Sequence, residues 1–176
     1  AGGGTAKEEK PLFRAGWMSD THIGKTRESC LRMKMALELF RKFEVDVVIN
    51  NGDIADHYYP TGYEAYRAIM DETFEGVKKP QEIYVWAWHD VYEWNGPRVR
   101  ESTAEQRKAC YADVAKRLGI PHKMTDKITV KGYTFLVFPQ WTGDIEYGGK
   151  RGAAARERAV ADAEAAAGGK PVFVVD

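Results

Sequence analysis

The sequence lacks any run of apolar residues long enough to span a bilayer, which argues against a transmembrane helix. It also lacks an excess of charge, because 26 Lys and Arg residues balance 26 Asp and Glu residues. A formal net charge of zero argues against a broad surface for nucleic acid or an anionic membrane. Cysteine is scarce, and the spacing of Cys30 and Cys110 fits no metal-binding knuckle. The two could pair in an oxidising compartment, but we expect free thiols.

Several common motifs of α/β proteins are also absent. Neither G-x-G-x-x-G nor G-x-x-x-x-G-K-[ST] follows the first expected strand, which argues against the common nucleotide-binding domains. No G-x-S-x-G is present, which argues against a serine nucleophile on a sharp strand-to-helix turn. The function therefore has to be sought in other residue types.

The composition is that of one soluble, globular domain. Of the 176 residues, 44% are hydrophobic and 30% are charged, enough of each for a sizeable core and a solvated surface. We expect residues 1–10, which contain a Gly-rich run, to be a flexible leader and residues 11–176 to be the domain. The first residue is Ala rather than Met, which indicates either a processed chain, as in an exported protein, or a shortened sequence. The sequence does not identify the compartment.

Hydrophobic periodicity predicts an α/β fold with a largely parallel sheet, because expected strands and helices alternate along the chain. The strands are expected at residues 12–18, 45–50, 82–88 and 171–175, with a hairpin at 127–138. The helices are expected at residues 28–43, 62–76, 102–118 and 151–167, the third opened by a capping box of Ser102 and Glu105. In the first helix, apolar residues recur at every fourth position and predict its buried face: Leu31, Met35, Leu39 and Phe43.

Polar residues follow three of these strands where each strand ends. The pairs are Asp20 with His22, Asn51 with Asp53, and His89 with Asp90. Since parallel strands end at one rim of a sheet, these side chains can converge, and ligands bind at that rim. Carboxylate oxygens beside imidazole nitrogens suit a borderline divalent cation such as Zn, Mn or Fe. Asp and Asn also favour such junctions as helix caps and turns, but three clusters of this kind favour a metal site.

The order of these motifs resembles the calcineurin-like metallophosphoesterases. The chain has D-x-H at Asp20 and His22, then G-D-x-x-D from Gly52 to Asp56, then a strand ending at His89. The resemblance implies a layered α/β/β/α sandwich, in which two sheets pack face to face with helices outside. It also implies two metal ions bridged by one aspartate in an intact family member, with Mn, Fe or Zn as the expected metals.

By this resemblance, Asp20 and His22 hold the first metal ion and Asp53 bridges the two ions. His89 lies beside the substrate phosphate, as a charge stabiliser or as a proton donor to the leaving oxygen. The implied function is a metal-dependent phosphomonoesterase or phosphodiesterase that uses activated water, because a pair of cations can clamp a phosphate and activate water. The implied partner is a phosphorylated small molecule or another phosphoester.

Three further residues are candidates for supporting the metal ligands or contacting the substrate. They are Asn51, Asp56 and Asp90. A carboxylate in such a position can fix the tautomer of an imidazole or orient a ligand. A helix cap or a surface charge is the structural alternative for Asp56 and Asp90.

The sequence departs from the family pattern in two places. Ala87 and Trp88 stand where the family has Gly-Asn, and an indole has no lone pair to replace the Asn ligand of the second metal. The family's later His and its G-H-x-H motif have no counterpart in residues 1–176. We therefore expect a domain that is incomplete at its C-terminal end, with an exposed sheet edge and exposed apolar surface. The alternative function is a catalytically inactive, phosphoesterase-like binding or structural domain.

Overall fold

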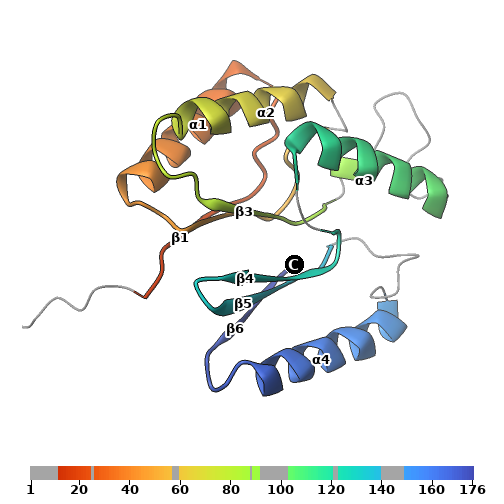
Figure 1. The fold of residues 1–176 in the computed structure, drawn as a ribbon. Helices are drawn as coiled ribbons and strands as arrows, with labels where there is room; N and C mark the ends of the chain where they lie inside the picture. The colour runs from red at the N-terminus through yellow and green to blue at the C-terminus, as the bar shows by residue number, and fades with distance from the viewer. Residues whose placement is uncertain are drawn as a thin grey trace, which may run out of the picture.

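A computed structural model describes residues 12–24, 26–56, 60–87, 89–91, 103–120, 123–139 and 149–176 of the chain. Within these residues the protein is a mixed α/β molecule with four α-helices and two three-stranded sheets (Figure 1). The leader that the sequence predicts at residues 1–10 lies outside the described part. No helix in the described part is both long and apolar enough to cross a membrane.

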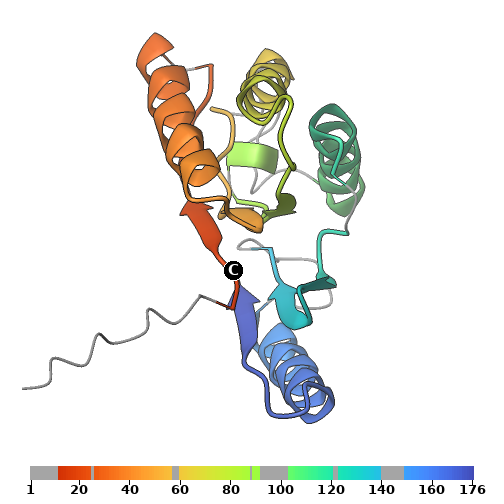
Figure 2. The ribbon, with the colours of Figure 1, turned by 60° about the vertical axis from the view of Figure 1, so that its left-hand side comes forward.

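The first sheet is parallel and has the strand order β1-β2-β3. Its strands are β1 (Ala15–Met18), β2 (Val47–Asn50) and β3 (Gln81–Tyr84). The connecting helices are α1 (Arg27–Lys42) and α2 (Pro60–Thr73), and α3 (Ala104–Leu118) follows the short 3-10 turn at His89–Val91. The three helices lie on one side of this sheet (Figures 1 and 2), and a buried apolar cluster joins them to it.

The second sheet combines a hairpin with a parallel strand. Strands β4 (Asp126–Val130) and β5 (Tyr133–Val137) are antiparallel, and β6 (Val172–Val175) is parallel to β5. Helix α4 (Gly149–Ala166) packs against this sheet through Ala163, which joins Leu136 and Phe138 in a small cluster. The hairpin predicted at residues 127–138 and the helix predicted at 151–167 are both present.

A second apolar cluster lies between the two sheets. It contains side chains from β2, from β3 and the residue after it, and from all three strands of the second sheet: Val47, Ile49, Ile83, Val85, Ile128, Val130, Phe135, Val137 and Val175. Val48, between Val47 and Ile49, belongs instead to the cluster under the helices. Strand β2 is thus buried on both faces, as its continuous apolar sequence predicts.

The predicted buried face of α1 is wrong. The side of α1 that packs against the sheet and α2 carries Met33 and Leu37, with Phe40 partly buried beside them. The four residues predicted to be buried are 52–66% exposed: Leu31, Met35, Leu39 and Phe43. Helix α1 has apolar residues on two sides, and Gly16 decides between them, because a Cβ there would lie 2.5 Å from the Phe40 ring. The bare glycine therefore lets the Phe40 side approach the sheet.

The start of α3 also differs from the prediction. Thr103 is the N-cap, and its hydroxyl accepts a hydrogen bond from the backbone amide of Gln106 at 3.2 Å. The side chain of Gln106 completes the capping box, so the box is displaced by one residue from the predicted pair Ser102 and Glu105. The two cysteines are free thiols, as predicted.

Candidate metal centre

The chain segments that follow β1 and β2 run side by side past the ends of their strands. The backbone amide of Asp20 donates to the carbonyl of Gly52 at 3.1 Å, and that of His22 donates to the carbonyl of Asp53 at 3.0 Å. These hydrogen bonds extend the parallel pairing beyond the sheet. They bring the D-x-H segment next to Asp53, as the parallel arrangement of the strands predicts.

Three of the predicted metal ligands have a left-handed backbone. Asp20, His22 and Asp53 have φ values of 53°, 43° and 50°, although none of them is glycine. In the described part of the chain the other two such residues, Glu44 and Lys131, lie in turns. A left-handed conformation costs a non-glycine residue about 1–2 kcal/mol, and such strain gathers at functional sites. The paired loops hold these residues in a conformation that they would not adopt alone.

One group of side chains consists of Asp20, His22 and Asp53, and it could hold a metal ion. His22 Nε2 lies 3.9 Å from Asp20 Oδ1 and 4.0 Å from Asp53 Oδ2. The Asp20 side chain is 67% exposed, whereas the Asp53 side chain is only 18% exposed. The group therefore combines one exposed carboxylate at the surface with one largely buried carboxylate below it.

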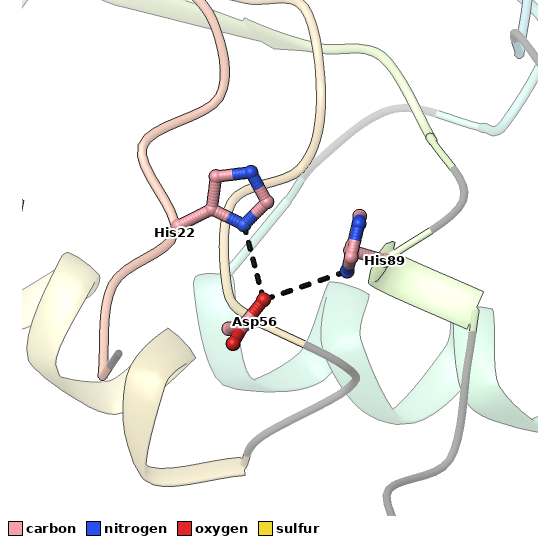
Figure 3. A group of neighbouring side chains, drawn as sticks. All are labelled: His22, Asp56 and His89. Atoms are coloured by element: carbon pink, nitrogen blue, oxygen red, sulfur yellow. Dashed lines mark ion pairs between the residues drawn. The ribbon is translucent and has the colours of Figure 1, made fainter. Parts of the chain in front are cut away.

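A second group consists of His22, Asp56 and His89 (Figure 3). Asp56 Oδ1 lies between the two imidazoles, 3.3 Å from His22 Nδ1 and 3.5 Å from His89 Nδ1. The rings meet edge to face, with centroids 4.9 Å apart and an interplanar angle of 84°. Asp56 thus contacts both imidazoles, and its role in orienting them stays a prediction.

The two groups share His22, and they offer alternative uses of its ring. A neutral imidazole gives a metal ion one nitrogen, and its other N–H commonly donates to a carboxylate. In one arrangement Asp56 accepts from both Nδ1 atoms, so that both Nε2 atoms remain for ligands. In the other arrangement the Nδ1 atoms and Asp56 hold the ion themselves. Asp53 Oδ2 lies 4.0 Å from the Nε2 atom of each ring, which suits the first arrangement, whereas neither Nδ1 atom makes a hydrogen bond to Asp56, which suits the second.

The donor atoms fit a divalent ion. Around an ion with bonds of about 2.0–2.2 Å, tetrahedral ligand atoms lie about 3.3–3.6 Å apart. The separations at His22 Nε2 are 3.9 and 4.0 Å, and the exposed Asp20 side chain has room to move closer. Two carboxylates with one imidazole are a suitable donor set for Mn, Fe or Zn.

Asp53 is anchored to the segment that follows β3. The backbone amide of His89 donates to Asp53 Oδ1 at 3.1 Å. This contact occupies one carboxylate oxygen and leaves Oδ2 directed toward the two imidazoles. Asp53 therefore joins the ends of β2 and β3 at the centre of the site.

Asp90 is fully buried beneath these loops. Its carboxylate accepts hydrogen bonds from the backbone amides of Asp53 at 2.9 Å, Ile54 at 3.0 Å and Ala87 at 3.3 Å. The hydroxyl of Tyr63 donates to Asp90 Oδ1 at 3.3 Å. Burial raises the pKa of Asp90 to about 7, with Asp53 acting in the same direction and the amides opposing it. Asp90 therefore supports the backbone of the site, and it contacts the amide of Asp53.

Sequence reasoning did not identify Tyr63 or Ser19. Tyr63 lies in α2 under Asp90, and Ser19 Oγ donates to Asp20 Oδ2 at 2.5 Å. Tyr63 is one of two tyrosines in its helix, and the sequence does not distinguish it from Tyr66. Ser19 directly precedes the D-x-H motif and could have been considered on that ground.

The structure does not bring Asn51 into either group. Its side-chain Nδ2 donates to the main-chain oxygen of Asp176 at 2.9 Å, which ties the end of β2 to the second sheet. A role for Asn51 beside metal or substrate stays a prediction. Trp88 lies outside the described residues, so its predicted effect on a second metal also stays a prediction.

A hollow of about 430 Å³ opens beside Asp20 and His22. Its far wall is the start of α1, with Thr26, Ser29 and Arg32 among the residues that line it. The hollow is large enough for a small phosphoester, and it borders the exposed side of the first group.

Comparison with known proteins finds a likeness in fold. No family model matches the sequence, and no curated protein matches it either. A dimetal phosphatase from Danio rerio has a similar structure, with a TM-score of 0.50 and 14% identity over 87% of this chain. The match covers 52% of the phosphatase chain, so this chain spans about half its length. The chain thus has a mixed α/β fold similar to that of a dimetal phosphatase, with His and Asp groups that could bind a divalent ion.

Proposed function

We propose that the chain carries the centre of a metal-dependent phosphoester hydrolase of the calcineurin-like type. The observation that carries the proposal is the position of Asp53, whose Oδ2 lies 4.0 Å from the Nε2 atom of both His22 and His89. A carboxylate shared in this way by the ends of three neighbouring strands suits a ligand that bridges two ions. The proposal includes the layered α/β/β/α sandwich, of which residues 11–176 would form the N-terminal portion.

In this proposal, Asp20, His22 and Asp53 hold a divalent ion. Asp56 Oδ1 lies 3.3 Å from His22 Nδ1, and a hydrogen bond formed there on metal binding would direct Nε2 toward the ion, an arrangement that commonly strengthens metal binding. A bound divalent ion supplies Lewis acidity toward a phosphoryl oxygen of the substrate. The backbone hydrogen bonds between the two loops hold the left-handed backbone at these three residues.

His89 is the proposed catalytic residue. Asp56 contacts its Nδ1 atom at 3.5 Å, which leaves Nε2 on the side of the ring that faces Asp53. From there it would stabilise charge on the phosphate or donate a proton to the leaving oxygen, as a general acid does. A phosphomonoester or phosphodiester in the hollow would contact Asp20 and His22, which line it, and would have to extend past them toward Asp53 to reach His89.

The 176 residues provide ligands for one metal ion more fully than for two. For a second ion, the matched motifs supply one ligand, Asp53. Trp88 stands in place of the family's Asn, and residues 1–176 contain no later His motif. We therefore expect one tightly held ion per chain and slow hydrolysis. The substitution at Trp88 also favours the second candidate function, a phosphoesterase-like binding or structural domain without activity.

The test is titration of the chain with Mn²⁺, followed by calorimetry or by electron paramagnetic resonance. Asp53→Asn should weaken binding by at least about 10–100-fold, because it removes a charged ligand oxygen from the centre. The matched control is Asp126→Asn, since Asp126 lies outside both candidate groups and accepts hydrogen bonds from the backbone amides of Lys123 and Lys127. Equal Mn²⁺ affinity in the two variants would overturn the proposed centre.

Hydrolysis of bis-p-nitrophenyl phosphate distinguishes the two candidate functions. With Mn²⁺ the chain should show a low rate that Asp53→Asn abolishes and Asp126→Asn leaves unchanged. Tight Mn²⁺ binding with no rate above background would favour the inactive binding domain. Two tightly held ions per chain would contradict our expectation of a single complete ion site.

A further inference from the structure

Helix α1 presents an exposed apolar line on the side opposite its packed face. The exposed fractions are 52% for Leu31, 66% for Met35, 53% for Leu39 and 59% for Phe43. Figure 2 shows α1 and β1 at the outer margin of the molecule. Apolar residues that gather on one surface in this way mark an interaction site more often than scattered ones do.

Charged residues alternate in sign along the same side of α1. With about 100° per residue, seven residues lie within about 60° of the direction of Met35. In chain order they are Glu28, Leu31, Arg32, Met35, Glu38, Leu39 and Lys42, and we call them the outer face of α1. All seven are exposed.

Residues of the outer face form pairs at equal distances before and after Met35. The apolar pair has the same residue on both sides, and each charged pair has opposite signs on the two sides. Leu31 and Leu39 lie four residues before and after Met35. At seven residues before and after, Glu28 is negative and Lys42 is positive. At three residues before and after, Arg32 is positive and Glu38 is negative. The face is therefore complementary to its own copy in reverse direction.

We propose that the outer face of α1 is an interface between two copies of this chain, with the helices antiparallel and a two-fold axis at Met35. In this pairing Met35 meets its own copy and Leu31 packs near Leu39 of the other chain. Glu28 then faces Lys42, and the long side chains of Arg32 and Glu38 flank the apolar centre. A parallel pairing would instead bring each charge against its own copy, which is repulsive.

The contact that helix α1 offers is small. The helix is only about 24 Å long, and a stable interface buries about 1,200–2,000 Å² in total. The open edge of β1 does not enlarge this contact, because β1 lies beneath the helix, where Phe40 packs over Gly16, and the outer face points away from the sheet. We therefore expect a weak dimer that forms only at high concentration.

The test is the oligomeric state of the 176-residue chain, measured by sedimentation velocity over a range of concentrations. We expect a monomer–dimer equilibrium with a dimer at high concentration. Glu28→Lys and Lys42→Glu should each weaken the dimer at least tenfold, because each places like charges opposite one another twice. The double variant Glu28→Lys/Lys42→Glu should restore it. Glu157→Lys, an identical charge change on the exposed side of α4, is the matched control and should leave the dimer unchanged.

Three results would overturn the proposal. The first is a chain that stays monomeric at every concentration. The second is a dimer that neither single variant weakens, which would place the interface elsewhere. The third is a double variant as weak as the single ones, which would exclude the antiparallel register. Circular dichroism on each variant checks that α1 remains folded. Glu28 also lines the hollow beside Asp20 and His22 whereas Lys42 does not, so Lys42→Glu is the variant whose Mn²⁺ titration should match that of the native chain.

Discussion

The two sheets of this protein differ in what their loops carry. The first sheet is entirely parallel, and the loops at its carboxyl end hold both candidate metal groups of the described residues. The second sheet is built on a hairpin, and its turn holds Lys131 and Gly132 at the opposite side of the core. The rim of the first sheet carries three left-handed non-glycine residues and a buried carboxylate, whereas the second sheet has one such left-handed residue, Lys131, in its turn and supplies an apolar surface behind the first. Within the described residues, the candidate metal groups therefore lie at the rim of the parallel sheet alone.

Glycine substitutions should give the largest difference in unfolding free energy between the two regions. A Cβ at Gly52 would lie 2.5 Å from the Ala87 Cβ and 3.0 Å from backbone atoms, and its φ is +93°. Gly52→Ala should therefore cost about 2–5 kcal/mol of unfolding free energy, from overpacking and from the left-handed backbone together. Gly168, before β6, has a φ of +60° but open space around it, so Gly168→Ala should cost only about 1–2 kcal/mol.

Urea denaturation of both glycine variants checks this prediction. The structural reason is the tight packing of the loop after β2 against the segment after β3. An equal loss of unfolding free energy in the two variants would mean that this loop adapts as readily as a surface turn. The close packing at the site would then contribute nothing to stability.

The buried carboxylate of the first region should give the next largest effect. Asp90→Asn replaces an acceptor of three backbone amides by a group that carries two donors of its own. We expect a loss of about 1–3 kcal/mol, the cost of leaving buried amides without acceptors. Thermal and urea unfolding measure it, with Asp126→Asn in the second region as the control that should lose less. If Asp90→Asn loses no more than the control, the support that we assign to Asp90 is wrong.

The smallest effect concerns the contact between the two regions. Lys131 Nζ lies 2.7 Å from Asp46 Oδ1, and the backbone amide of Arg14 donates to Asp46 Oδ2 at 3.0 Å. Burial opposes the ionisation of Asp46, but these partners outweigh it and hold its pKa below the ordinary value. The stabilisation is therefore present above the unfolded pKa and is lost as the pH falls through the folded pKa.

Asp46→Asn should thus lower the unfolding free energy at neutral pH by about 0.5 kcal/mol, as expected for one ion pair near the surface. The difference between the variant and the native chain should shrink on acidification below the unfolded pKa of an aspartate, about 3.9. Urea unfolding at several pH values measures both effects. A difference that stays constant with pH would show that the amide of Arg14, and not the charge, determines the contribution of Asp46.

The sequence allowed the neighbourhood of Asp20, His22, Asp53 and His89 to be predicted, because parallel strands end at one rim. It did not predict that one oxygen of Asp56 contacts both imidazoles, since this depends on how three separate segments pack together. The buried side of α1 was predicted incorrectly for a related reason. The helix has two apolar sides, and the choice between them depends on the bare surface of Gly16 in another element. Local patterns therefore predicted the elements, while contacts between distant elements decided the details.

A single oxygen atom of Asp56 contacts both imidazoles, and this has a consequence for their independence. If the His89 ring rotates, the Asp56 carboxylate either follows it or loses its contact with His89. A carboxylate that follows His89 shifts relative to the His22 ring. The two rings and the carboxylate thus form one mechanical unit. In a double-mutant cycle, replacing His22 and His89 together should cost less metal affinity than the sum of the single replacements, because the first replacement already releases the shared oxygen.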